Sequence, residues 1–172
     1  MKVKMNKIIL LYSIVFGVSV LFLTACGGDS KDSNTTSQTV NTNTSGLSDW
    51  ELASGFGPVK KKLNLGPIDP AMAKEGEKIF ESKCATCHKL DERYTGPAQR
   101  NVLQRVTPEF FMNTVLNPDE NLAKHPHSKE MLAQYMTKMT NQNVTLKDAR
   151  ALLEYFRVLD EELVKNQSTT KK

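Results

Sequence analysis

The chain has 172 residues, of which 39% are hydrophobic, and a formal net charge of +4, a composition that suits one modest globular core. Residues 69–162 nevertheless carry 13 Lys and Arg against 15 Asp and Glu, so the excess positive charge lies outside the globular part. Nucleic-acid binding needs basic charge clustered on the folded module, and this sequence does not support that class of partner.

Residues 1–25 have the pattern of a secretory signal: a lysine-rich start, the apolar run IILLYSIVFGVSVLFL and small residues before Cys26. The stretch LTAC, which ends at Cys26, resembles the bacterial lipobox, and this implies that Cys26 is lipidated and becomes the first residue of the mature protein. An uncleaved transmembrane helix is the alternative, although the apolar run is only marginally long enough. Both interpretations predict a membrane-anchored protein that faces the periplasm or the cell exterior.

Two non-globular segments follow. Residues 26–48 are rich in Ser, Thr, Asn and Gly and cannot bury enough surface to offset the entropy of ordering them, so they are predicted to form a flexible tether. In residues 49–68 apolar residues return, and Gly and Pro break any helix. We expect an extended arm there, packed on the domain through Trp50 and Phe56 rather than exposed as a partner surface.

Four helical patterns occupy residues 69–164, and no alternating strand pattern is longer than a few residues. The sequence therefore predicts a small all-α domain with long loops, followed by a disordered tail at 165–172. The loop from His88 to Val106 is long for so small a domain and should wrap around something. The expected helices are Pro70 to Cys84, capped by Asp69; Thr107 to Leu116; Ser128 to Met136; and the longest, which opens at Thr145 with Asp148 in capping-box spacing.

The stretch Cys84-Ala85-Thr86-Cys87-His88 carries the strongest chemical signal. A Cys-x-x-Cys pair followed at once by His is the pattern of covalent haem attachment: the two thiols add to the haem vinyl groups, and His88 comes beneath the iron as the proximal ligand. A redox dithiol, a zinc site and a chance match are the alternatives. The first lacks a neighbouring βαβ pattern, and the second has only His125 and His127 as further ligands besides His88.

Residues 69–164 contain, in this order, a helix, the haem motif, a Gly-Pro loop, a methionine and a C-terminal helix with aromatic residues. This order of features resembles that of a monohaem class I cytochrome c. The resemblance implies a fold of about four helices around one covalent haem c. It also implies that Gly76 and Phe80 pack against Tyr155 or Phe156, and that the carbonyl of Pro97 accepts a hydrogen bond from His88 and orients its ring.

The family pattern places the sixth iron ligand at Met139, in the loop before the last helix, although Thr140 stands where the family often has proline. Met136 competes for this role, but it continues an apolar stripe and is expected in the core, as is Met112. Ligation by His125 or His127 and an open sixth site are further hypotheses, and we expect the two histidines to be exposed loop residues.

His and Met ligation leaves no position for a substrate, so the sequence predicts a one-electron carrier and not an enzyme. A haem sensor or peroxidase-like protein with an exchangeable sixth ligand is the alternative, and a non-haem lipoprotein for assembly or adhesion is a third. Lysines that could surround the haem edge are Lys83, Lys89, Lys138 and Lys60 to Lys62.

More narrowly, the stretches GFGPVKKKLNLGPIDPAMAKEGEKIF, CHKLDERYTGPA and MTNQNVTLKDARALLEYF resemble the small lipoprotein cytochromes that accompany nitrous oxide reductase in some bacteria. This resemblance implies electron transfer from a quinol-oxidising complex to a periplasmic reductase such as nitrous oxide reductase.

Overall fold

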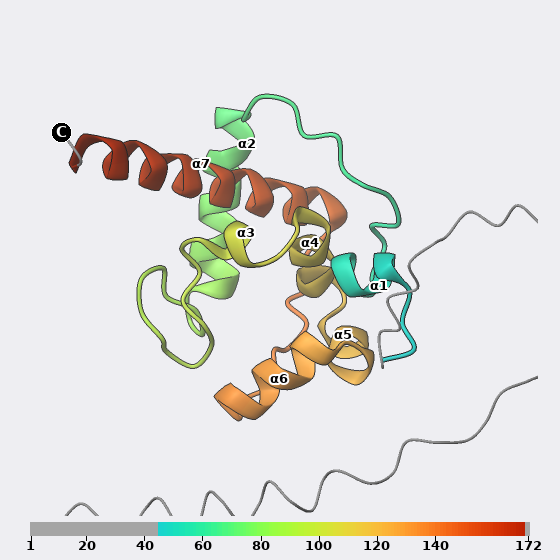
Figure 1. Cartoon of the computed structure of the whole chain (residues 1–172). Helices are drawn as coiled ribbons and strands as arrows, with labels where there is room; N and C mark the ends of the chain where they lie inside the picture. The colour runs from blue at the N-terminus through green and yellow to red at the C-terminus, as the bar shows by residue number, and fades with distance from the viewer. Residues whose placement is uncertain (1–44, 171–172) are drawn as a thin grey trace, which may run out of the picture. The chain divides into compact units, whose positions relative to one another are not determined.

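The computed structural model describes residues 45–170, and within that range every regular element is helical (Figure 1). The predicted all-α class is confirmed, with more helices than the expected four. The predicted signal sequence, Cys26 and most of the tether lie outside the described residues. The elements are α1 (Asp49–Ser54), α2 (Pro70–Ile79), the π-helical segment η1 (Phe80–Cys84), α3 (Val102–Arg105), α4 (Pro108–Leu116), α5 (Pro118–Lys124), α6 (Pro126–Tyr135) and α7 (Leu146–Thr170).

Three helices begin at the side-chain caps that the sequence predicts. Asp69 Oδ1 accepts hydrogen bonds from two N–H groups of the first turn of α2, at 2.9 and 3.0 Å. The Thr107 hydroxyl accepts one from the first turn of α4 at 3.0 Å, and Thr145 and Asp148 form both halves of a capping box before α7. These contacts satisfy N–H groups that have no partner inside the helix.

Helix α1 corrects the prediction that residues 49–68 are extended throughout. The N–H of Glu51 donates to the Ser48 hydroxyl (3.3 Å), and the N–H of Ser48 donates to the Glu51 carboxylate (2.9 Å). This reciprocal pair starts the helix. Gly55 ends it with a φ of +65°, a left-handed value that glycine adopts without strain.

Other boundaries also differ from the sequence prediction. Helices α3 and α5 lie in segments for which the sequence predicts no helix, and α6 begins at Pro126 instead of Ser128, because proline suits the first helical position. Helix α7 continues to Thr170, through residues 165–170 of the predicted disordered tail. An ion pair between Glu161 and Lys165, four residues apart at 3.5 Å, supports this extension.

The core forms where α2 crosses α7 (Figure 1). Gly76 of α2 lies so close to α7 that a Cβ at this position would be 2.0 Å from the carbonyl oxygen of Ala151. One turn further along, at the start of η1, the ring centroid of Phe80 lies 5.5 Å from that of Phe156 and 5.9 Å from that of Tyr155. The implied contact between a glycine and an aromatic residue on the first helix and aromatic residues on the last helix is therefore present.

Two buried asparagines hold the arm, residues 49–68, by its backbone. The Asn113 amide oxygen accepts from the N–H of Val59 (2.9 Å), and its nitrogen donates to the carbonyls of Ser54 (2.9 Å) and Val59 (3.0 Å). Asn121 accepts from the N–H of Phe56 (2.9 Å) and donates to the Phe56 carbonyl (2.6 Å). Buried backbone groups need hydrogen-bond partners, and here the two side-chain amides supply the bonds that a helix or a sheet would otherwise provide.

The rest of the arm is fixed in the same way, with Phe56 buried and Trp50 half-buried, so the prediction that the arm packs on the domain is confirmed. A Cβ at Gly57 would lie 2.3 Å from Asn113 Oδ1, so only glycine permits this approach. Further hydrogen bonds join the Thr107 hydroxyl to Ala53 O (2.6 Å), His125 Nε2 to Leu52 O (3.1 Å), the N–H of Leu63 to Glu109 Oε1 (2.7 Å) and the Arg157 guanidinium to Gly66 O (2.8 Å).

Glu154 is a buried carboxylate at the point where the arm meets α2. It is fully buried, forms ion pairs with Arg150 and Arg157, and accepts a hydrogen bond from the N–H of Asp69 at 3.1 Å. Burial alone would raise its pKa, but the hydrogen bonds from the two arginines and from Asp69 outweigh burial and hold the pKa below the usual 4.5. The ionised form is therefore the one that the fold stabilises.

Acid is expected to weaken the domain through this carboxylate. A pKa that is lower in the folded than in the unfolded state adds stability above the unfolded pKa, and this stability is lost as the pH falls through the folded value. Glu154→Gln should cost about 2 kcal/mol at neutral pH and should then lose less stability than the parent on acidification below about pH 4.5. Urea unfolding at several pH values measures this, with the exposed Glu75→Gln as the control. Parallel pH profiles for parent and Glu154→Gln would contradict the assignment.

Candidate functional site

The Cys-x-x-Cys-His turn follows a local widening of the first core helix. In η1 the N–H of Ala85 donates to the carbonyl of Phe80, five residues earlier, at 2.9 Å. The carbonyl of Cys84 then accepts from the N–H groups of Cys87 (3.0 Å) and His88 (2.9 Å). Single π turns are frequent at functional sites, and this one places both thiols and the histidine on one tight turn.

The two thiols have different surroundings, since Cys84 is half-buried and Cys87 is exposed. Burial raises the pKa of the Cys84 thiol to about 11, against a smaller lowering effect of Lys83. The Cys84 thiol is therefore not the activated, low-pKa thiolate of a redox site. Within residues 45–170, moreover, no three or more His, Cys, Asp and Glu side chains are grouped as a metal site would need.

His88 is oriented by the loop that follows it. Its Nδ1 lies 3.0 Å from the carbonyl oxygen of Pro97, so the predicted hydrogen bond is present. The backbone of Gly96 touches the ring, because a Cβ at this glycine would lie 2.4 Å from His88 Cε1, and its N–H donates to the Cys87 carbonyl at 2.9 Å. A carbonyl can only accept, so Nδ1 carries the proton and Nε2 is the nitrogen with a lone pair for a metal.

Burial lowers the pKa of His88, although the hydrogen bond to Pro97 opposes this effect. The neutral imidazole is therefore favoured, and this is the form that ligates metals. Two thiols at the spacing of haem attachment, a neutral histidine with a fixed ring and a glycine that keeps that ring uncrowded together form a donor set that fits a c-type haem.

Gln99 also contacts this site, and the sequence alone gives no signal for it. Its amide nitrogen lies 2.9 Å from the carbonyl oxygen of Pro97 and 2.9 Å from Nδ1 of His88. A glutamine in a loop is ordinarily a solvent-exposed residue, and only the folded structure brings it to the histidine.

Met139 lies half-buried in the segment between α6 and α7, and this segment is bound on both sides of it to the haem-motif region. Before Met139, the Arg93 guanidinium donates to the carbonyl of Gln134 (2.8 Å) and stacks 4.5 Å from the Tyr135 ring centroid. After Met139, the Lys83 ammonium lies 3.5 Å from the carbonyls of residues 142 and 143. The long loop and η1 thus hold both flanks of this methionine.

The competing ligands have different positions from those that the sequence predicts. Met136 is not in the core as expected but is 83% exposed, because it ends α6 in the left-handed conformation with φ +54°. His125 is not an exposed loop residue as expected but is buried at the start of α6, against the Phe110 ring at 4.7 Å, with Nε2 bound to the arm. His127 lies inside α6. Met112 is buried as predicted.

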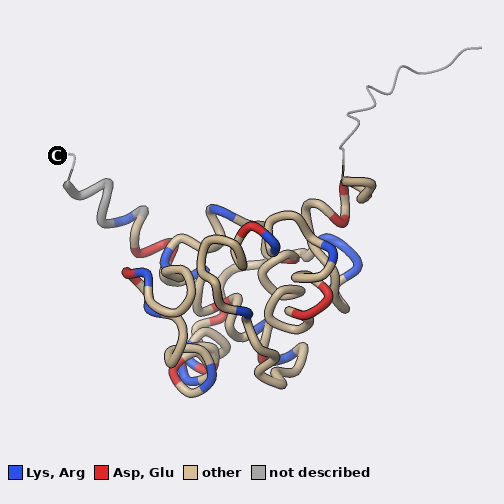
Figure 2. Tube along the Cα trace, turned by 90° about the horizontal axis from the view of Figure 1, so that it is seen from below, with Lys and Arg blue, Asp and Glu red and all other residues tan. Residues whose placement is uncertain are grey.

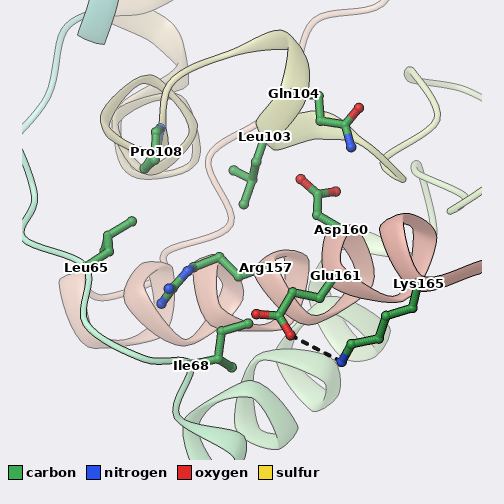
Figure 3. Close-up of a pocket in the computed structure, with 9 residues that line it drawn as sticks. All are labelled: Leu65, Ile68, Leu103, Gln104, Pro108, Arg157, Asp160, Glu161 and Lys165. Carbon is green, nitrogen blue, oxygen red and sulfur yellow. Dashed lines mark ion pairs between the residues drawn. The ribbon is translucent and has the colours of Figure 1, made fainter. Parts of the chain in front are cut away.

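A surface pocket of about 430 Å³ lies between the arm, α3 and α7 (Figure 3). None of the residues that line it belongs to residues 84–100, which hold the haem motif and Pro97, or to the segment between α6 and α7. Within the described residues, no helix combines the length and the apolar character needed to cross a bilayer.

Comparison with known proteins gives a consistent result. The family model described as cytochrome c matches residues 73–160. A cytochrome c-551 from Stutzerimonas stutzeri is 47% identical over 36 residues, which are 20% of this chain and 35% of that protein. The match thus spans about a third of that relative's length.

Solved structures match over a longer range. The cytochrome c from Rhodothermus marinus is 43% identical and superposes with a TM-score of 0.62 over 65% of this chain and 97% of that one. An engineered form of that protein is 44% identical, with a TM-score of 0.61 over 64% of this chain and 96% of that chain. The helical fold described above is therefore the class I cytochrome fold.

Proposed function

Since the chain belongs to the cytochrome c family and binds one covalent haem c, we propose that it carries single electrons between redox proteins while anchored to a bacterial membrane. The observation that carries this proposal is the tight turn that presents two thiols and a His88 ring whose Nδ1 is held by Pro97. The bound haem supplies a one-electron couple at iron, and the residues described above attach and orient it.

In this proposal Cys84 and Cys87 form the two thioether bonds and Nε2 of His88 binds iron. Pro97 acts through His88, because its carbonyl fixes the plane of the imidazole and increases its basicity. A pyridine haemochrome spectrum of the full chain, expressed with haem-maturation machinery, tests the attachment. A spectrum typical of two thioether bonds is expected, and its absence would refute the assignment.

Met139 is proposed as the sixth ligand. The supporting observation is that both flanks of its segment are fixed to the parts of the chain that surround the haem motif, through Arg93 on one side and Lys83 on the other. Met136 is a weaker candidate, since it is exposed at the end of α6. Ligation by His and Met gives a comparatively high reduction potential and closes the iron to substrates, as suits a carrier rather than an enzyme.

Met139→Ala is expected to abolish the weak far-red methionine-to-iron band of the oxidised protein and to lower the reduction potential, because the thioether no longer stabilises ferrous iron. Absorption spectroscopy and a redox titration measure these changes. Met136→Ala is the matched control and should retain the band. If the band survives in Met139→Ala, the ligand is another residue. Rapid binding of carbon monoxide by the ferrous parent would instead favour the alternative function, a haem sensor or peroxidase-like protein.

The membrane anchor is proposed from the leader alone. Its basic start, its apolar run and the LTAC stretch support lipidation at Cys26 and a location facing the periplasm or the cell exterior. Labelling with a radioactive fatty acid, with Cys26→Ser as the control, tests this. Unlabelled parent protein would contradict it.

The proposed partners are a quinol-oxidising complex as electron donor and a periplasmic reductase, such as nitrous oxide reductase, as acceptor. Support comes from the resemblance of the arm and haem segments to the lipoprotein cytochromes of that system. Figure 2 shows Lys and Arg interspersed with Asp and Glu along the described trace, so steering would depend on local charge around the haem edge. Stopped-flow oxidation of the reduced protein by nitrous oxide reductase tests the acceptor, and the lack of any transfer would exclude this enzyme.

A further inference from the structure

One carbonyl oxygen in the Pro97 loop has two donors. Nδ1 of His88 lies 3.0 Å from the oxygen of Pro97, and the amide nitrogen of Gln99 lies 2.9 Å from the same oxygen. The two nitrogens are themselves 2.9 Å apart. Both groups therefore converge on a single acceptor.

The orientation of the Gln99 amide follows from the chemistry of its neighbours. The Pro97 oxygen has lone pairs and no proton, so the group of Gln99 that faces it must be the NH₂ end. Nδ1 of His88 also carries a proton when Nε2 binds iron. The close contact between Gln99 and His88 is thus one between two donors, and each is satisfied only by Pro97.

The backbone holds Gln99 in this position. Its N–H donates to the carbonyl of Lys89 (2.9 Å), and its carbonyl accepts from the N–H of Val102 (3.1 Å). The next residue, Arg100, donates its N–H to the carbonyl of Leu90 at 2.8 Å. These bonds join the two sides of the loop and fix the backbone from which the half-buried Gln99 side chain reaches the Pro97 carbonyl.

We propose that Gln99 is a positioning residue that raises the reduction potential of the haem iron by competing with His88 for the Pro97 carbonyl. An acceptor shared between two donors binds each of them less strongly, so the imidazole of His88 keeps less anionic character. The positive end of the amide dipole, 2.9 Å from Nδ1, acts in the same direction. A less basic histidine stabilises ferric iron less, and the reduced protein is favoured. This inference rests on the proposed ligation of iron by His88.

The test uses the full-length holoprotein and two variants without an amide, Gln99→Leu and Gln99→Met, which differ in shape. Both should have a lower reduction potential than the parent. In equilibrium with a mediator of fixed potential, the ratio of oxidised to reduced protein should rise by up to about tenfold, which corresponds to about 59 mV for a one-electron couple. Gln104→Leu is the control, because Gln104 is an exposed amide of α3, and its potential should stay at the parent value.

A second readout separates this effect from a general loss of packing. The Nδ1 proton of His88 in the reduced protein should move downfield in the NMR spectrum of both variants, since its hydrogen bond to Pro97 strengthens. An unchanged or higher potential in a variant that retains the methionine-to-iron band would overturn the inference and leave the proposed function intact. A parent protein without a c-type haem spectrum would overturn both.

Discussion

Gly76→Ala is expected to destabilise the domain by about 3 kcal/mol or more, at or beyond the upper end of the usual cost of overpacking. A Cβ at this position would lie 2.0 Å from the carbonyl oxygen of Ala151, 2.5 Å from its carbonyl carbon and 2.9 Å from the nitrogen of Leu152. All three are backbone atoms of α7, which cannot turn aside as a side chain can. The two helices must separate, and the aromatic contacts of Phe80 must loosen with them. Urea unfolding of the holoprotein measures the loss.

Gly66→Ala is the matched control for this substitution. No atom lies within 4 Å of a Cβ built at Gly66, so the same added methyl group should change the unfolding free energy by less than about 0.5 kcal/mol. Equal midpoints for the two variants would show that the close crossing of α2 and α7 is not what requires glycine at position 76.

Asn113→Ala should cost roughly 3 kcal/mol or more, since leaving a buried donor or acceptor unpaired costs about 1–3 kcal/mol for each group. Asn113 is fully buried on α4, and its one amide serves three backbone groups of the arm: the N–H and carbonyl of Val59 and the carbonyl of Ser54. Alanine leaves all three without partners. The arm is then expected to detach, and limited proteolysis should cut it before the rest of the domain.

Two further variants test this interpretation of Asn113. Asn117→Ala, at the end of the same helix, removes an amide whose nitrogen donates only to Glu120, and it should cost about 1 kcal/mol or less. Asn113→Asp keeps an acceptor for Val59 but loses both donated bonds, so it should resemble alanine. If Asn113→Asp is as stable and as resistant to proteolysis as the parent, the two donated hydrogen bonds do not fasten the arm.

The sequence predicts those parts of the molecule that depend on neighbouring residues. The caps at Asp69, Thr107 and Thr145 bind N–H groups no more than three residues away in the sequence, and the haem motif lies on a single turn. Both features can therefore be recognised from the amino-acid sequence. The packing of Gly76 and Phe80 on the last helix could be predicted only through resemblance to a family, because the contact joins distant segments. The order of the helices along the sequence does not by itself determine which of them pack against each other.

The structural features that the sequence does not predict depend on distant contacts or on one backbone angle. His125 resembles a surface histidine beside a proline, but the Phe110 ring and the backbone of Leu52 in the arm cover it. Met136 continues an apolar stripe, but a left-handed φ turns it away from the core. Gln99 has no local motif, since its role depends on the bonds that bring residues 89 and 90 beside 99 and 100.

The way in which the arm is fastened has a consequence for the order of folding. Its side-chain partners lie 46 to 91 residues later in the chain, from Thr107 to Arg157. A nascent chain emerges from its N-terminus, so the arm leaves the ribosome before the helices that bind it, and Arg157, the last of its partners, follows 91 residues after Gly66. Closing such long loops is also slow. The arm can therefore complete its contacts with the domain only after α7 has been made, so it is the part of the fold that closes last.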